Sequence, residues 1–309
     1  MKKVFVLAAF LLLAACNYGN ASFQEPDVIR IAYLPITHSA AVMMLPYVAG
    51  PDCEFRIELV RFIGWPEVVE ALSAGHVHGA SVLFEVAVNA HQRGSNWSVI
   101  SLSHRDGNVI VVDNSISDIR GLVGKTVAIP HAHSPHMTLL GKVLASEGLS
   151  IYDINLVELS PAEMPFTMAA RAISAYVVAE PWGSLAVSRG AGRILVNSAD
   201  VIPDSVCCLF VFDTDVLSGR EGLYEWLLER FAIATEMTEN LEPSVVGVFR
   251  QDTGFDIDII NKSLQNTNFT NLEFTLEDFK ATVQNVLRYG VLYDFPTFED
   301  FVGRRQQQK

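Results

Sequence analysis

Residues 66–84, PEVVEALSAGHVHGASVLF, decide the fold class of this chain, because a helical pattern runs directly into a strand pattern. Apolar residues recur at helical spacing over Pro66–Ala74, and Val77–Phe84 is a short apolar run typical of a buried strand. Another strand pattern, Glu54–Phe62, comes just before them. Strands that alternate with helices predict an α/β fold built around mostly parallel sheets.

The same alternation continues on both sides of this stretch, and it occurs in two series. The first series begins at Val28, and the second begins at Lys125. Residues 220–302 are almost entirely helical by pattern, including Leu223–Asn240 and Leu276–Leu287. The predicted strands are Val28–Leu34, Glu54–Phe62, Val77–Phe84, Trp97–Ser101, Val109–Val112, Lys125–Ile129, Asn155–Leu159, Ala175–Ala179, Arg193–Asn197 and Val206–Phe212.

A chain of 309 residues exceeds the usual size of one domain, so we expect two β/α lobes. The helical tail returns to the first lobe, which requires two interlobe crossings, near 111–114 and near 208–214. The first lobe then comprises 28–111 and 214–303, and the second lobe comprises 112–213. In open α/β sheets ligands bind beyond the carboxyl ends of the strands, which places a ligand cleft between the lobes.

The first residues have the pattern of an export signal. A basic start at Lys2 and Lys3 is followed by an apolar run too short to span a bilayer. Residues 13–16, Leu-Ala-Ala-Cys, look like a bacterial lipobox. We therefore expect a signal peptide over 1–16 that ends at a lipidated Cys16, a tether over 17–27, and an exported, membrane-anchored protein. The alternative is an ordinary signal peptide with a chance cysteine.

The net charge of −13 argues against nucleic acid as a partner, since nucleic-acid binding requires a basic face. We expect a monomer. Adjacent Cys207 and Cys208 lie in an apolar, strand-like run, so buried thiols are favoured over a disulfide. No CxxC pair is present, and the pairing of Cys53 with either stays open.

Five segments resemble a known family when they are taken in order. They are the lipobox, IRIAYLP (29–35) with THSA (37–40), GWPEVVEALSAGHVHGA (64–80), DIRGLVGKTVAIP (118–130) and AYVVAEPWGSLA (175–186). Together they are similar to the nitrate/sulfonate/taurine and thiamine-pyrimidine-precursor group of periplasmic binding proteins. The resemblance covers about residues 28–303 and implies the type II periplasmic binding protein fold. His78 stands where that family usually has Asp, and Ala179 where it often has Gly.

Three turns in the first lobe supply candidate ligand-binding residues. Thr37, His38 and Ser39 follow the first strand, where their side chains either cap the next helix or contact a ligand. Trp65, which precedes Pro66, is either a lid over the cleft or a packing residue. Phe84 is either a stacking wall or part of the core.

Two turns in the second lobe supply the other candidates. His131, His133, Ser134 and His136 follow its first strand, and Ser134 is a natural N-cap with Pro135 at the first helical position. The resemblance implies that the turn of Glu180 and Trp182 faces the cleft. There Glu180 either accepts hydrogen bonds from a ligand or caps a helix, and Trp182 is a candidate for stacking.

The sequence therefore predicts a solute-binding lipoprotein that delivers a small organic molecule to the permease subunits of an ABC importer. The aromatic residues and the carboxylate expected at the cleft favour a planar, thiamine-pyrimidine-precursor-like heterocycle, followed by sulfonate, nitrate or taurine. We predict no catalytic residue, no cofactor and no bound metal. Arg105 is a weak candidate counter-ion for an anionic solute, or else pairs with Asp106 between the lobes.

Three alternatives stay open at this point. One is a metal-binding receptor that uses the turn of His131, His133 and His136. Another is an enzyme related to a pyrimidine synthase, although the chain lacks the cysteine-rich motif of that enzyme and shows no GxSxG, Walker or GxGxxG motif. The third is a lipoprotein scaffold that binds no ligand.

Overall fold

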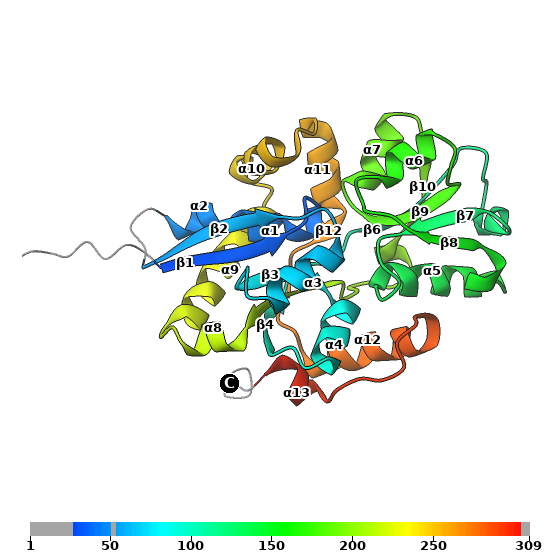
Figure 1. Cartoon of the computed structure of the whole chain (residues 1–309). Coiled ribbons are helices and arrows are strands. Elements are labelled where there is room, and N and C mark those ends of the chain that lie inside the picture. Colours follow the sequence, from blue (N-terminus) through cyan, green and yellow to red (C-terminus); the bar gives the residue numbers. More distant parts are fainter. Residues whose placement is uncertain (1–26, 51–53, 304–309) are drawn as a thin grey trace, which may run out of the picture.

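The computed structural model describes residues 27–50 and 54–303. The predicted signal peptide with Cys16, the tether up to residue 26, and Cys53 lie outside the described residues. Two five-stranded sheets form the centres of two lobes (Figure 1). This architecture confirms the predicted two-lobed α/β fold.

The first sheet has the strand order β2-β1-β3-β11-β4. Strand β1 pairs in parallel with β2 and β3, whereas β11 runs antiparallel to β3 and β4. The strands are β1 (Asp27–Tyr33), β2 (Phe55–Arg61), β3 (Gly79–Leu83), β4 (Trp97–Leu102) and β11 (Cys208–Asp213). The decisive stretch is thus a β-α-β unit, with α3 (Trp65–Ser73) between β2 and β3.

The second sheet has the order β10-β6-β9-β7-β8 and repeats the parallel core of the first. Strand β7 is parallel to β8 and β9, and β6 runs antiparallel to β9 and β10. The strands are β6 (Asn108–Val112), β7 (Thr126–Ile129), β8 (Asn155–Glu158), β9 (Ala175–Ala179) and β10 (Arg193–Asn197). A third, two-stranded sheet pairs β5 (Arg105–Asp106) with β12 (Thr267–Asn268).

Strand alternation explains how the two lobes share a hydrophobic core. Val111 and Val178 belong to the larger core, which extends into the first lobe, whereas their neighbours Ile110 and Val177 belong to a second core. Successive side chains of a strand point to opposite faces, so one face of the second sheet packs on α6 (Met164–Ala169) and α7 (Trp182–Ser188), whose buried residues belong to the larger core. The second core contains α5 (Pro135–Ser146) through residues such as Leu140.

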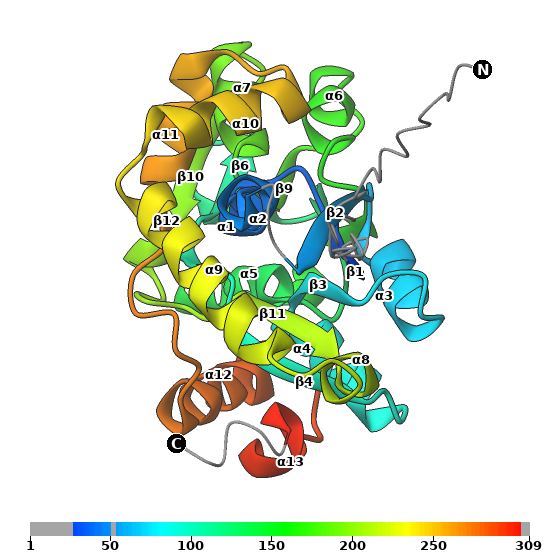
Figure 2. The same cartoon turned by 90° about the vertical axis from the view of Figure 1, so that its left-hand side faces the viewer.

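The helical tail is as predicted, and it contacts both lobes. Figures 1 and 2 show α11 beside α7 (Trp182–Ser188) and α12 beside α5. An added Cβ at Gly141 of α5 would lie 2.3 Å from the carbonyl oxygen of Tyr289, so only glycine permits this approach of α5 and α12. The tail helices are α8 (Thr214–Ser218), α9 (Leu223–Glu239), α10 (Pro243–Thr253), α11 (Ile257–Gln265), α12 (Leu276–Tyr289) and α13 (Phe298–Val302).

The chain passes between the sheets slightly earlier than the predicted lobe boundaries at 111/112 and 213/214. It leaves β4 and enters β6 through residues 103–107, and it returns from β10 to β11 through residues 198–207. Both passages begin with polar turns, and each is followed by an apolar strand. The predicted boundaries assign each of these two strands to the lobe that the chain has just left. The Cys208–Asp213 strand is in the first sheet, and Asn108–Val112 is in the second.

Local structure sets the position of four candidate residues, Phe84, Thr37, His38 and Ser39. Phe84 is not at the end of a strand but is the first residue of α4 (Phe84–Gln92). After β1 the chain forms a 3₁₀ turn at Thr37–Ser39, then α1 (Ala40–Met43) and α2 (Leu45–Ala49), with a proline in the first turn of α2. The short helix α6 is Met164–Ala169. In the part of the chain that the structure describes, no helix has the length and apolar character to cross a membrane.

Candidate functional site

The ends of strands from the two lobes face one another, as the fold predicts. The backbone N–H of Thr37, after β1, donates to the carbonyl of Glu180, after β9, at 2.8 Å. The Thr37 hydroxyl also lies 2.8 Å from that of Thr267 in the tail. These contacts join the two lobes next to His38 and Ser39, which follow Thr37 in the chain.

Four buried side chains meet directly behind this contact, and we call His38, His104, Cys207 and Cys208 the interlobe cluster. The rings of His38 and His104 stack with their centroids 3.6 Å apart and their planes 24° from parallel. His38 Nδ1 lies 3.6 Å from Cys207 Sγ and 3.9 Å from Cys208 Sγ, and the two sulfurs are 3.9 Å apart. One donor atom from each of the four lies within 4.8 Å of the others.

The charges within the interlobe cluster are set by burial and by close contact. Burial, and then the neighbouring His104, lower the pKa of His38, so its imidazole is neutral near pH 7. Burial alone would raise the pKa of Cys207, but hydrogen bonding, first with Cys208 and then with the neighbouring histidines, lowers it well below the ordinary value. Burial and the proximity of Cys207 raise the pKa of Cys208. Cys207 is therefore the more acidic of the two thiols, and its sulfur accepts a hydrogen bond from Asn108 Nδ2 at 3.3 Å.

Further polar groups around the cluster are buried without a hydrogen-bond partner among the described residues. They are Ser39 Oγ, Glu85 Oε2, Asn108 Oδ1 and both ring nitrogens of His136. Burial raises the pKa of Glu85 to about 8 and lowers that of His136 to about 4, so both are neutral at pH 7. Because an unsatisfied buried polar group costs free energy, such a concentration indicates a place that binds a ligand.

A small cavity adjoins this site. It has a volume of about 170 Å³, and Glu85, Asn108 and Thr138 are among its lining residues. A larger cavity of about 1200 Å³ lies against α9 and the start of α12, and the interlobe cluster lines neither cavity. Two of the residues with unsatisfied polar atoms, Glu85 and Asn108, associate the candidate site with the smaller cavity.

Comparison with known proteins identifies the family. The model of the NMT1-like family matches residues 23–244. The chain belongs to the NMT1-like family. This membership confirms the resemblance found in the sequence.

The proteins to which this NMT1-like chain is similar include several binding proteins. The ligand-binding component of an ABC-type import system from Staphylococcus aureus, with zinc bound, is 29% identical, with a TM-score of 0.81 over 90% of this chain and 96% of that one. The alkanesulfonate-binding protein SsuA from Xanthomonas axonopodis pv. citri, bound to MOPS, is 20% identical, with a TM-score of 0.74 over 85% and 92%. An aliphatic sulfonates-binding protein of Escherichia coli K12 is 21% identical over 88% of this chain and 86% of its own length. These relatives are not enzymes, in agreement with the sequence prediction.

The histidine turn of this NMT1-like chain does not gather into one ligand set. His131 Nδ1 accepts a hydrogen bond from the His133 backbone at 3.0 Å, and His133 Nδ1 lies 2.7 Å from Asn89 Nδ2 of the first lobe. His136 is buried on α5 and is electrostatically coupled to His38 and His104. Among the described residues, only the interlobe cluster has donor atoms close enough together to hold a metal ion. The alternative based on the histidine turn is therefore not supported. Ser134 caps α5 at the Met137 N–H, as predicted.

Glu180 caps the start of α7 locally, and its contact with a ligand remains a prediction. Its carboxylate accepts hydrogen bonds from the backbone N–H and the hydroxyl of Ser184, both at 2.8 Å. Burial outweighs these bonds and raises the pKa of Glu180. Asn266 from the tail donates to the same carboxylate at 3.3 Å, so Glu180 also links the second lobe to α11.

The predicted aromatic walls are largely engaged in packing. Phe84 contacts Phe274, Phe279 and Phe301 edge to face, which places it within the core of the first lobe. Trp182 packs edge to face against Phe255 of the tail. Trp65 is 1% exposed. Their roles as stacking walls remain predictions.

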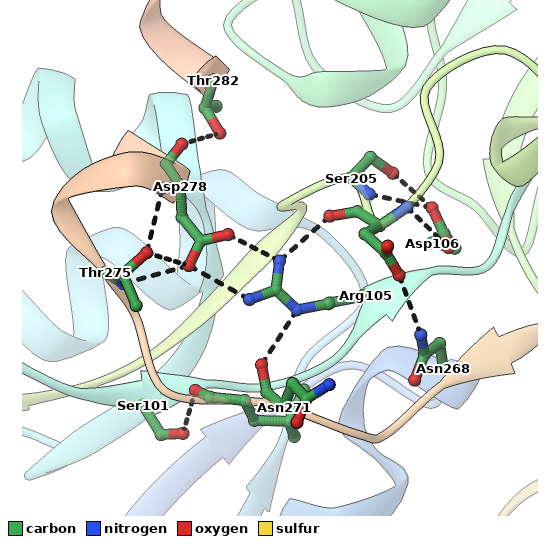
Figure 3. A network of polar contacts seen from close by, with 11 residues as sticks. Ser101, Arg105, Asp106, Ser205, Asn268, Asn271, Thr275, Asp278 and Thr282 are labelled. Carbon is green, nitrogen blue, oxygen red and sulfur yellow. Dashed lines mark hydrogen bonds and ion pairs between the residues drawn. The ribbon is translucent and has the colours of Figure 1, made fainter. Parts of the chain in front are cut away.

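Arg105 is not free to neutralise an anion, and it does not pair with Asp106. Its guanidinium makes two contacts with Asp278 of α12, at 2.7 and 3.1 Å, and donates to the carbonyls of Asn271 and Asp204 (Figure 3). Asp106 instead accepts hydrogen bonds from the backbone and hydroxyl of Ser205. The sequence suggested the wrong partner because Asp278 is far away along the chain.

Sequence reasoning missed His104, Cys207, Cys208, Glu85 and Asn108 as site residues. The pair of cysteines was predicted to be buried thiols, and both are indeed free and buried. A signal was nevertheless present. Both cysteines lie at the predicted crossing near 208–214, and a crossing between the lobes is where a cleft residue is expected. His104 lies in the other passage, which the structure places at 103–107.

Proposed function

We propose that this chain is the solute-binding subunit of an ABC importer, which captures a small solute at the interlobe site and delivers it to membrane permease subunits. The observation that carries the proposal is the group of buried, unsatisfied polar atoms from Ser39, Glu85, Asn108 and His136 between the lobes. The printed names of the relatives, which are binding components of importers, support it. A monomer suffices for this role, because both lobes come from one chain.

The first cargo class that we propose is an uncharged, planar nitrogen heterocycle of the thiamine-pyrimidine-precursor kind. Neutral His136 and the protonated carboxyl of Glu85 offer both donors and acceptors to such a ring. Arg105, which would favour an anion, is already bound to Asp278. Sulfonates, nitrate and taurine come next, supported by the names of the sulfonate-binding relatives.

Thermal unfolding of the purified chain with pyrimidines, flavins, sulfonates and nitrate tests the proposal. A true ligand at 100 times its dissociation constant should add about 2.7 kcal/mol to the free energy of unfolding. Ser39→Ala is expected to reduce this stabilisation without destabilising the free protein, because Ser39 Oγ has no hydrogen-bond partner among the described residues. Exposed Ser218 provides the control variant Ser218→Ala. If only sulfonates or nitrate stabilise the chain, the heterocycle is the wrong class.

We further propose that the receptor is exported and anchored to the membrane through lipid on Cys16. The lipobox at residues 13–16 supports this proposal. Cys16→Ser should move the protein from the detergent phase to the aqueous phase when bacterial cells that express it are extracted with a phase-separating detergent. Equal partitioning of the two proteins would rule out the anchor.

A metal ion is a second candidate for the delivered solute. The Staphylococcus aureus binding component, 29% identical over 90% of this chain, is described with zinc bound. The interlobe cluster supplies nitrogen and sulfur ligands of the type that zinc prefers. Sulfonate-binding relatives support the organic cargo instead.

A further inference from the structure

We propose that the interlobe cluster of His38, His104, Cys207 and Cys208 is a four-ligand site for a thiophilic divalent cation, with Zn²⁺ as the reference ion. This ligand set differs from the histidine turn that the sequence suggested. If the protein delivers the bound ion to the importer, the site rests on the proposed receptor function. Metal binding as such does not depend on that function.

The distances within the cluster fit a tetrahedral ion. Zinc binds sulfur at about 2.3 Å and imidazole nitrogen at about 2.0–2.1 Å, so tetrahedral angles put two sulfurs about 3.8 Å apart and a nitrogen and a sulfur about 3.6 Å apart. The two sulfurs here are 3.9 Å apart, and His38 Nδ1 lies 3.6 and 3.9 Å from them. Three of the four ligands thus already form one face of the tetrahedron.

His104 is the fourth ligand and needs a small movement. Its ring stacks on that of His38 at 3.6 Å, and no two of the four donor atoms are farther apart than 4.8 Å. A shift of about 1 Å would bring a ring nitrogen of His104 to the remaining vertex. His104 lies in the passage between β4 and β6, where the chain crosses from the first sheet to the second.

The charge of the set also fits a divalent ion. Two thiolates and two neutral imidazoles carry a charge of −2, so a divalent cation leaves the buried site neutral. Both thiols must be deprotonated to bind the ion, so binding releases protons into solution. Asn108 Nδ2 donates to Cys207 Sγ at 3.3 Å and orients this ligand.

The elements around the cluster explain why these ligands converge. His38 is in the turn after β1, and His104 follows β4. Cys208 is the first residue of β11, and Cys207 comes directly before it. Strand β11 pairs with both β3 and β4, which brings the cysteines beside the passage that carries His104. The strand order of the first sheet thus brings together residues from three segments that are far apart in the sequence.

Direct metal titration of the full chain, purified with reductant and freed of metal by chelator, tests the inference. We expect one Zn²⁺ per chain by competition with a chromophoric chelator, and a rise in the unfolding temperature. Co²⁺ should give thiolate-to-metal charge-transfer bands and intense tetrahedral ligand-field bands. Absence of a bound ion, or a weak octahedral Co²⁺ spectrum, would overturn the inference.

Variants identify the ligands. Cys208→Ser and His104→Gln should each weaken Zn²⁺ binding by about 100-fold or more. His131→Gln and His133→Gln, in the turn suggested by the sequence, should leave it unchanged. Circular dichroism checks folding, and the Co²⁺ spectrum of the unaltered chain decides the question if a variant does not fold. Loss of binding in the His131 or His133 variant would refute this ligand set.

The failure of this inference is distinguishable from the failure of the proposed function. A chain that binds no metal but is stabilised by an organic solute remains a receptor with the cargo class proposed first. A chain that binds Zn²⁺ but does not support uptake of any solute or metal when its importer is expressed keeps the metal site and loses the receptor role.

Discussion

Replacing Arg105 by alanine is expected to lower the free energy of unfolding by about 3–5 kcal/mol. Arg105 is 7% exposed, and its guanidinium donates two hydrogen bonds to the carboxylate of Asp278. Without Arg105, this partly buried carboxylate would have no counter-ion. Burial opposes ionisation of Asp278, but hydrogen bonds from Arg105 and Thr275 outweigh it and hold the pKa of Asp278 below its usual value. The variant also leaves the carbonyls of Asn271 and Asp204 without this donor.

Urea unfolding at pH 7 measures the effect, and Arg120→Ala is the matched control. Arg120 also pairs with a carboxylate, that of Glu147 at 2.9 Å, but its side chain is 74% exposed. Exposed pairs contribute about 0–1 kcal/mol, so the control should lose little stability. Similar small losses in both variants would show that the Arg105 network does not fasten the tail to the interlobe passage.

Glu85→Gln is expected to remove most of a pH dependence of stability between pH 5 and 8. Burial raises the pKa of Glu85 from 4.5 to about 8, so the folded protein binds a proton that the unfolded chain has released. The stability that this proton contributes is fully present below about pH 4.5 and is lost as the pH rises to about 8. One pKa unit corresponds to about 1.4 kcal/mol, which gives a fall of about 3–4 kcal/mol between pH 5 and 8.

Urea unfolding of the wild-type chain and of Glu85→Gln at pH 5, 6, 7 and 8 tests this expectation. The other titrating groups are common to both proteins, so the difference between the two curves isolates Glu85. At pH 8 the variant should be the more stable protein, and at pH 5 the two should be close. Exposed Glu70 gives the control Glu70→Gln, whose curve should follow the wild type. Parallel curves for Glu85→Gln and the wild type would mean that Glu85 is ionised throughout.

Most of the fold was predictable, because its signals are local. The β-α-β unit around α3, the N-cap at Ser134 and the long helices α9 and α12 each depend on a few neighbouring residues. The approach of Thr37 to Glu180 also followed, since the strand ends of both lobes meet at the cleft. Lobe boundaries were less accurate, because an apolar strand at a crossing fits either sheet equally well by pattern.

The site itself was only half predictable. His38 was a candidate because it follows a strand, but the interpretation of Cys207 and Cys208 as plain buried thiols was incomplete, since nothing nearby in the sequence shows that histidines cover them. His131 and His136 are close in sequence, yet one lies on a turn and the other is buried on a helix face. Spacing along the chain therefore suggested the wrong group of histidines.

The sequence by itself determined the alternation of strands and helices, the polar turns at the strand ends and the two passages between the lobes. These features follow from side-chain period, capping and chain direction, which act over short distances. Only the tertiary structure decided that His38, His104, Cys207 and Cys208 share one buried space and that Arg105 pairs with Asp278. Those contacts depend on the order of β1, β3, β11 and β4 within one sheet and on how the tail packs across both lobes, and no local pattern specifies either.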